Sequence, residues 1–266
     1  DVPLALLPAV LVGCYFLGLR AAILMVVSIA SCKIAEFLWC AVRRQPHTLR
    51  DCSAAVTGLL LALTLPVSVP YWVPVVGGFF AMLVVKGLGG GLGQNTFNPA
   101  LAARALLVLL FPAVMTRFAP VGTAISSASM SVDMVSAATP LHHMVMPELP
   151  NVSLLDAFLG NLPGSIGEVS ALALLIGGAY LVIRKVISLR IPVAYLATVA
   201  VLTLIFNKGQ DPVLWMAYNL LCGGVLLGAI FMATDYATTP VTPLGQMVYG
   251  VGCGVLTVVF RYFGLF

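Results

Sequence analysis

Apolar residues fill most of this chain in runs that approach the thickness of a lipid bilayer. A helix needs roughly 20 mainly apolar residues to cross the hydrocarbon core. The runs, some of them shorter, therefore predict an all-α polytopic membrane protein with about nine transmembrane helices. These are expected at about 3–19, 21–41, 54–66, 71–87, 97–115, 169–188, 191–206, 212–233 and 245–263.

Composition agrees with this pattern, since 61% of the residues are hydrophobic and 8% are charged, whereas soluble domains carry about 25% charged residues. The small net charge of +4 gives no sign of nucleic-acid binding. The six cysteines lie in or beside apolar runs and form no C-x-x-C pair. We therefore expect buried thiols rather than disulfides, and no metal site.

Basic residues predict the orientation, because short loops rich in Lys and Arg face the cytoplasm. Nine spans put three basic positions on one side and the N-terminus with them. The loop at 116–168 then lies on the opposite, extracytoplasmic side. Four basic residues (Arg20, Arg117, Lys208 and Arg261) do not follow the rule. The three positions are Arg43, Arg44 and Arg50; Lys86; and Arg184, Lys185 and Arg190.

The two halves of the chain show a weak internal similarity. Residues 57–64 (TGLLLALT) resemble residues 223–230 (GGVLLGAI). Each is followed by a polar, proline-containing break, at 95–99 and at 234–243. Duplicated halves with interrupted helices are typical of transporter folds, and the interruptions mark ligand sites. We therefore predict two inverted repeats, 1–115 and 169–266, and infer that a last helix of the second repeat is missing.

The two breaks carry the polar groups expected at such sites. In the first, glycines precede Asn95 and Asn98, whose amides offer donors and acceptors to a ligand. On the residues alone, a tight turn that caps the following helix is the simpler interpretation. In the second break, Asp235 either binds an imide or a cation, or caps the next turn, and the residues alone leave both open.

A polar insert from Met130 to Ser170 separates the halves and holds four of the nine acidic residues. Alone, Ser136-Ala137-Ala138-Thr139-Pro140 is an ordinary Ser/Thr turn. Before the next apolar run, Gly164-Ser165-Ile166-Gly167-Glu168 offers N–H groups and a hydroxyl to an anion such as phosphate. The neighbouring His142 and His143 point apart on regular structure and make a poor metal pair.

Together these motifs resemble a known family, the D subunit of the Rnf electron-transport complex, which is similar to the B subunit of the sodium-translocating NADH:quinone oxidoreductase. The resemblance covers nearly the whole chain. The usual polar N-terminal lead and a tenth, C-terminal helix are absent here. The resemblance is carried by residues 57–66 (TGLLLALTLP), 90–105 (GGLGQNTFNPALAARA), 133–141 (DMVSAATPL), 160–178 (GNLPGSIGEVSALALLIGG) and 231–246 (FMATDYATTPVTPLGQ).

The resemblance implies that FMN is joined through its phosphate to Thr139. Ala137 replaces the usual glycine of that motif, while Asp133, Ser136, Pro140 and Leu141 match it. The turn of Gly164, Ser165, Gly167 and Glu168 would then support the flavin or its phosphate. A second, non-covalent flavin, for which riboflavin is the candidate, would lie near the two breaks, at Asn95, Asn98, Asp235 and Thr238.

The implied function is electron relay in a ferredoxin:NAD+ oxidoreductase of the bacterial inner membrane, coupled to Na+ or H+ transport. The implied partners are an extracytoplasmic FMN subunit, iron–sulfur subunits and a flavin transferase. No acid–base catalytic residue is expected. The alternative is a substrate transporter or channel with duplicated halves and no redox cofactor. A third interpretation is a purely structural anchor for neighbouring subunits.

Overall fold

The computed structural model describes residues 1–44, 51–90, 93–95, 97–118, 153–160, 163–208 and 210–263, and in these ranges it is all-helical apart from one isolated bridge between Pro66 and Ser165. The all-α part of the predicted fold class is therefore confirmed, and the two inverted repeats stay a prediction. The helices of the first half are α1 (Val2–Leu17), α2 (Leu19–Arg43), α3 (Ser53–Leu63), α4 (Trp72–Phe79) with its π-helical continuation η2 (Phe80–Leu88), α5 (Pro99–Leu110) and α6 (Pro112–Met115).

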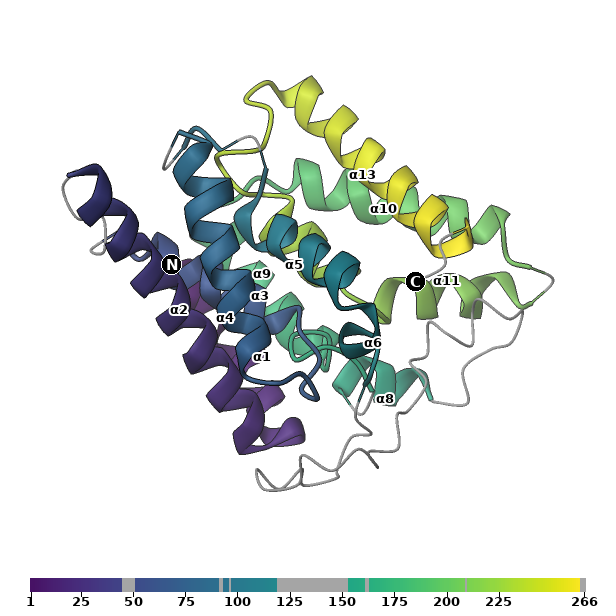
Figure 1. Ribbon diagram of the computed structural model, residues 1–266. Coiled ribbons are helices and arrows are strands. Elements are labelled where there is room, and N and C mark those ends of the chain that lie inside the picture. Colours follow the sequence, from purple (N-terminus) through teal and green to yellow (C-terminus); the bar gives the residue numbers. More distant parts are fainter. Residues whose placement is uncertain are drawn as a thin grey trace.

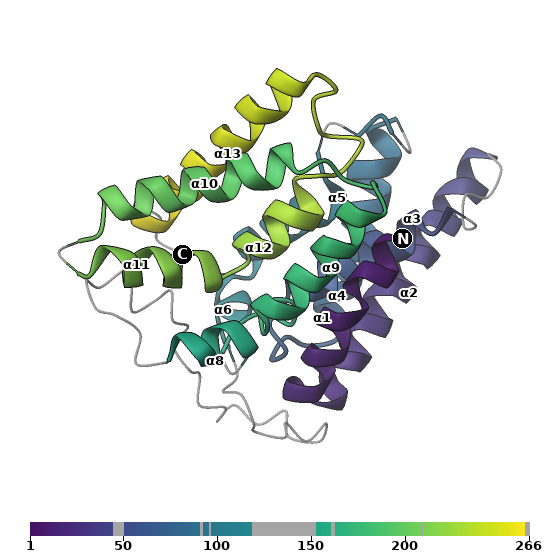
Figure 2. The ribbon, with the colours of Figure 1, turned by 180° about the vertical axis from the view of Figure 1, so that it is seen from behind.

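The second half begins with the short α8 (Leu154–Leu159). It continues with α9 (Ala171–Ile183), α10 (Arg190–Ile205), α11 (Pro212–Leu221), α12 (Val225–Leu227) with its π-helical continuation η3 (Gly228–Met232), and α13 (Pro243–Phe263). Figures 1 and 2 show α10, α11 and α13 grouped on one side and α1 to α5 with α9 on the other.

Each predicted apolar run contains a helix, but the helices differ in length from the runs. Among the described residues, α2 and α13 are long and apolar enough to cross a membrane alone. The pair of α11 with α12–η3 makes a third span if its 61° bend lies within one span, and six further apolar helices are shorter. The membrane character is thus supported, and the count of nine spans stays a prediction.

Sequence signals explain where several helices begin. Asn98 caps α5 by accepting from the N–H groups of Ala100 and Leu101, with Pro99 in the first turn. In the same way Ser170 caps α9 and Asp211 caps α11. Such side chains satisfy backbone N–H groups that the first helical turn leaves free. The predicted run 212–233 is interrupted internally, because Gly223 adopts a positive φ of 75° there.

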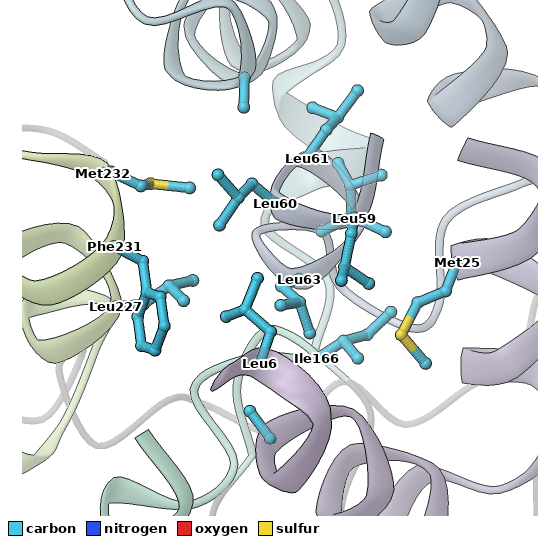
Figure 3. Close-up of a cluster of buried hydrophobic side chains, with 14 of the residues drawn as sticks. Leu6, Met25, Leu59, Leu60, Leu61, Leu63, Ile166, Leu227, Phe231 and Met232 are labelled. Atoms are coloured by element: carbon cyan, nitrogen blue, oxygen red, sulfur yellow. The ribbon is translucent and has the colours of Figure 1, made fainter. Parts of the chain in front are cut away.

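The core is centred on α3, whose residues from Gly58 to Leu63 are all buried. Figure 3 shows Leu63 of α3 among Leu6 of α1, Ile166 and Leu227. The close approach of α2 to α3 needs a glycine, since a Cβ on Gly58 would lie 2.7 Å from the Cα of Ile29. In the first half α2 packs on α3 and α4, and in the second half α10 packs on α11 and α13.

Candidate functional site

The predicted attachment site of the flavin lies outside the described residues. This applies to Ser136, Thr139 and Pro140, so the covalent FMN remains a prediction. The described chain resumes at 153–160 and again at 163, immediately before the turn that is expected to support the flavin.

The turn at 163–170 binds to the C-terminal end of α3. The N–H of Gly167 donates to the carbonyl oxygen of Leu63 at 2.7 Å, and the N–H of Ile166 donates to that of Leu65 at 3.0 Å. Within the turn, the N–H of Glu168 donates to the carbonyl of Ser165, and the N–H of Ser165 to a Glu168 carboxylate oxygen. These four N–H groups are used inside the protein, so support for a phosphate would have to come from the side chains.

Arg104 of α5 joins this turn to the same helix end. Its guanidinium donates to the carbonyl of Thr64 at 2.6 Å and lies 3.9 Å from a carboxylate oxygen of Glu168. A cation is favourable here, because helix C-termini carry partial negative charge. Glu168 also contacts the second half, since a Cβ on Gly224 would lie 2.8 Å from its Oε1. The predicted Glu168 therefore lies at the junction of both halves, whereas Arg104 was not predicted as a site residue.

Ser165, another predicted site residue, is fully buried. Its hydroxyl has no hydrogen-bond partner in the part of the chain that the structure describes. Gly164 lies beside Glu168, because a Cβ there would be 3.4 Å from the Oε2 of that residue. The turn thus holds one buried polar group whose hydrogen bonds are not accounted for by the described residues, which is unusual in a native interior.

The first predicted break meets the second at Asn98. The side-chain oxygen of Asn98 caps α5, and its Nδ2 donates to the carbonyl of Met232 at 3.5 Å. This matches the turn-and-cap interpretation and also brings the two breaks together. Asn95 differs: it is 7% exposed, and its Oδ1 has no partner among the described residues. Asn95 therefore offers the acceptor that an imide N–H of a flavin requires.

Asp235 lies between η3 and α13 in a half-buried position. Its carbonyl accepts from the N–H of Thr238 at 3.3 Å, which is the hydrogen bond of a turn. Burial raises the pKa of the Asp235 carboxyl, and a hydrogen bond from the backbone of Ala237 partly opposes this. The structure therefore shows a turn at Asp235.

Arginines hold two more breaks in the chain, and sequence analysis did not assign them this role. Arg261 of α13 donates to the carbonyls of Asn219 at 2.5 Å and Cys222 at 3.0 Å, where α11 ends. Arg20 of α2 donates to the carbonyls of Val67 and Val69 after α3. Arg20 and Arg261 were exceptions to the charge rule, and these bonds explain how a cation is accommodated there.

One further charged pair is buried away from these breaks. The Lys86 ammonium of η2 lies 2.5 Å from a carboxylate oxygen of Glu36 on α2, and it donates to the Ser53 hydroxyl at 2.7 Å. Both charged side chains are less than 10% exposed. Lys86 is one of the three basic positions expected on the cytoplasmic side, and the structure shows it buried and paired.

Comparisons with known proteins identify the family of this chain. The sequence profile of the NQR2, RnfD, RnfE family matches residues 1–266. The chain is 46% identical, over 99% of its length and 80% of the relative's, to the D subunit of the Na+-translocating ferredoxin:NAD+ oxidoreductase complex of Acetobacterium woodii. It is 38% identical, over 99% of its length and 81% of the relative's, to the D subunit of the proton-translocating ferredoxin:NAD+ oxidoreductase complex of Clostridium ljungdahlii.

A third relative, the D subunit of the ion-translocating oxidoreductase complex of Halorhodospira halophila, is 38% identical over 99% of this chain and 82% of its own length. The resemblance inferred from the motifs is therefore confirmed. The chain belongs to the NQR2, RnfD, RnfE family.

Proposed function

We propose that this chain is the D subunit of an ion-translocating ferredoxin:NAD+ oxidoreductase of the bacterial inner membrane, and that it relays electrons through flavin. The observation that carries the proposal is the match of the whole chain to relatives named as the D subunit of such complexes. Those relatives are named for different ions, Na+ and H+. Similarity therefore does not choose between them, and the proposal covers both.

The covalent flavin is proposed to be FMN, joined through its phosphate to Thr139. A phosphoester needs a hydroxyl oxygen, and Thr139 and Ser136 both carry one within the motif. The position in the family motif selects Thr139. In this proposal the loop at 116–168 is extracytoplasmic, the N-terminus is cytoplasmic, and a flavin transferase modifies the loop.

The turn at 163–170 would fix the end of the flavin-bearing segment to the core. Its backbone donors bind the end of α3, and Glu168 lies between Arg104 and Gly224. A segment held at one end by a rigid helix can be positioned reproducibly relative to neighbouring electron carriers. The buried hydroxyl of Ser165 is the group of this turn that remains for a flavin or its phosphate, because the Glu168 carboxylate already lies near Arg104 and would repel a phosphate.

A second, non-covalent flavin, proposed to be riboflavin, would lie where the two breaks meet. Asn95 supplies a buried acceptor without a partner among the described residues, and apolar helix walls would exclude water from the rings. When bound, such a flavin supplies electron transfer, and the chain orients it. Asn98 would contribute less through its side chain than its position in the motif implies, since that amide already caps α5 and binds Met232.

The decisive experiment is in-gel ultraviolet fluorescence of the denatured subunit, purified from cells that contain the transferase. Wild type should fluoresce, and its intact mass should include FMN. Thr139→Ala should be dark, whereas the matched control Ser136→Thr, which keeps a hydroxyl at that motif position, should keep the flavin. A dark, unmodified wild type would contradict the proposal and favour the transporter alternative. Intact electron transfer in Thr139→Ala would favour a structural anchor.

The second flavin is tested by extracting non-covalent flavin from the purified complex. Asn95→Ala should lower the amount of riboflavin released per complex, because it removes the buried acceptor. Asn98→Ala should lower the thermal stability more than Asn95→Ala does, because it removes a helix cap. Unchanged riboflavin in both variants would place that flavin elsewhere.

A further inference from the structure

The exposed side of α2 carries an unexpected charge. The exposed residues of this helix follow one another at intervals of three and four, as one face of a helix does. Lys33 lies in the middle of this face and is itself exposed. Figures 1 and 2 both show α2 at the outer edge of the helix assembly. We call this the Lys33 face, and it consists of Val26, Ala30, Lys33, Ile34, Phe37, Leu38, Ala41 and Val42.

The position of Lys33 along the helix places it deep in the bilayer. α2 is one of the described helices that can cross a membrane alone. Arg43, at its end, lies over the ring of Trp39 at 4.9 Å, an arrangement suited to the membrane surface. Lys33 precedes Arg43 by ten residues, about 15 Å along a helix, and this is roughly half of the hydrocarbon thickness.

Lipid cannot readily satisfy a charge at that depth. A lysine can extend its stem toward the surface, but the four-carbon stem covers only part of the distance to the lipid phosphates. The segment between Lys33 and Arg43 stays apolar on this face, since Phe37 and Leu38 are exposed there. Intramembrane charges are expensive unless they pair or face a cavity.

The same helix shows how such a charge is normally accommodated. Glu36, which points into the protein, pairs with Lys86 at 2.5 Å. Lys33 makes no ion pair with any residue that the structure describes. The small side chain of Ala30 lies one turn away on the same face and permits close helix approach. A partner is therefore both needed and sterically accommodated.

We propose that the Lys33 face docks a transmembrane helix of another subunit, and that this helix carries a carboxylate that pairs with Lys33. The inference rests on the proposed membership in a multi-subunit complex. A lipid phosphate is the competing counter-ion, but the depth of Lys33 disfavours it. The ion pair would fix the rotation of the two helices, while Phe37, Leu38 and neighbouring side chains supply apolar contact.

The test compares Lys33→Met with Val26→Met in the intact complex, purified through a different subunit. Both variants place methionine on the same face, and only the first removes the charge. Lys33→Met should reduce recovery of this chain with the complex at least about tenfold, since it leaves a partner carboxylate unpaired in lipid. Val26→Met should be recovered as wild type. Normal recovery of Lys33→Met would overturn the proposal.

A second measurement separates loss of docking from loss of folding. A photo-crosslinking amino acid at Ile34 should label another subunit, at a helix with Asp or Glu within one turn of the labelled residue. Exchanging the charges, with Lys33→Glu and that acid changed to Lys, should restore recovery. Labelling of lipid alone, or of a helix without an acid there, would contradict the ion pair.

Flavin fluorescence read from the same gels keeps the two proposals distinct. A fluorescent Lys33→Met band that fails to purify with the complex supports docking in a correctly folded chain. A dark wild-type band defeats the proposed flavin function, and the recovery of Lys33→Met still decides the docking.

Discussion

Helices α3 and α11 both end inside the protein, and their last carbonyl groups are satisfied by different donors. α3 ends at Leu63 and α11 ends at Leu221, each inside the protein, where carbonyl groups lose their helical partners. At the end of α3, backbone N–H groups of Ile166 and Gly167 satisfy two carbonyls, and Arg104 satisfies a third. At the end of α11, the guanidinium of Arg261 donates to the carbonyls of Asn219 and Cys222. Among the described residues, no other donor reaches these two carbonyls across the break.

The end of α3 is also more extensively packed by apolar side chains than the end of α11. The α3 end lies in the main core, against Leu6, Ile166 and Leu227 (Figure 3). The α11 end lies beside a small satellite cluster formed by Ala157, Trp215, Tyr218 and Cys222. Unsatisfied backbone groups are especially unfavourable within a membrane. The first end should therefore be rigid and tolerant of single changes, whereas the second should depend on one side chain.

The largest effect is expected from Arg261→Met. This change removes the donor to Asn219 and Cys222 and leaves their carbonyls without it, which should lower the free energy of unfolding by about 2–3 kcal/mol. Arg261→Lys should fall between wild type and Arg261→Met, because one ammonium cannot reproduce the guanidinium fork. Thermal unfolding of the purified protein in one detergent measures the series. An unfolding midpoint for Arg261→Met equal to that of wild type would show that the end of α11 does not depend on Arg261.

Arg104→Met should have a smaller effect, about 1–2 kcal/mol, because the donors from Ile166 and Gly167 remain. Within this change, the ion pair with Glu168 should contribute little, since the charged atoms are 3.9 Å apart and the Arg104 side chain is a third exposed. A double-mutant cycle of Arg104→Met and Glu168→Gln should give a coupling energy below about 1 kcal/mol. If Arg104→Met lowered the free energy of unfolding more than Arg261→Met, the end of α3 would depend more on its arginine than the end of α11 does.

These networks show what the sequence could and could not predict. Among the described residues, hydropathy located the longer apolar helices to within several residues, because an apolar run is a local signal. The cap at Asn98 was also predictable, since Asn-Pro before an apolar run is a local signature. Arg104 and Arg261 were missed as clamps because each acts on carbonyls about 40 residues away in sequence. Only the packed fold brings those groups together.

The break inside 212–233 was missed for a different reason. Hydropathy does not change at Gly223-Gly224, and the interruption arises from backbone conformation at Gly223 and the approach of Glu168 to Gly224. For the flavin motif around Thr139, the sequence remains more informative than the structure, because that segment lies outside the described residues.

Gly223 and Gly224, at the break between α11 and α12, should respond differently to substitution by alanine. Gly223→Ala places a Cβ on a residue with φ of 75°, which disfavours L-residues by about 1–2 kcal/mol. Gly224→Ala should cost under about 1 kcal/mol. Its Cβ would meet only the end of the Glu168 side chain, which can move. Thermal unfolding of the pair distinguishes backbone strain from contact, and equal midpoints would show that the break tolerates either conformation.

The smallest effect on stability is expected at Asp235 in the second break. The first break carries the amides of Asn95 and Asn98 instead of an acid. Burial raises the folded pKa of Asp235 above its ordinary value of 3.8. The folded state therefore binds the proton more tightly than the unfolded state between the two pKa values, so stability falls as pH rises through that window. Above the folded pKa, the ionised carboxylate carries a constant penalty.

Asp235→Asn should remove this pH dependence, because an amide has no charge to desolvate. The variant should unfold at a slightly higher temperature than wild type at pH 7 and gain nothing at a pH below 3.8. Asn95→Asp provides the converse change at the first break: it introduces an acid at a position 7% exposed, and it should lower the midpoint at pH 7 by more than at acidic pH. A gain for Asp235→Asn that is the same at both pH values would show that contacts, rather than ionisation, distinguish the two breaks.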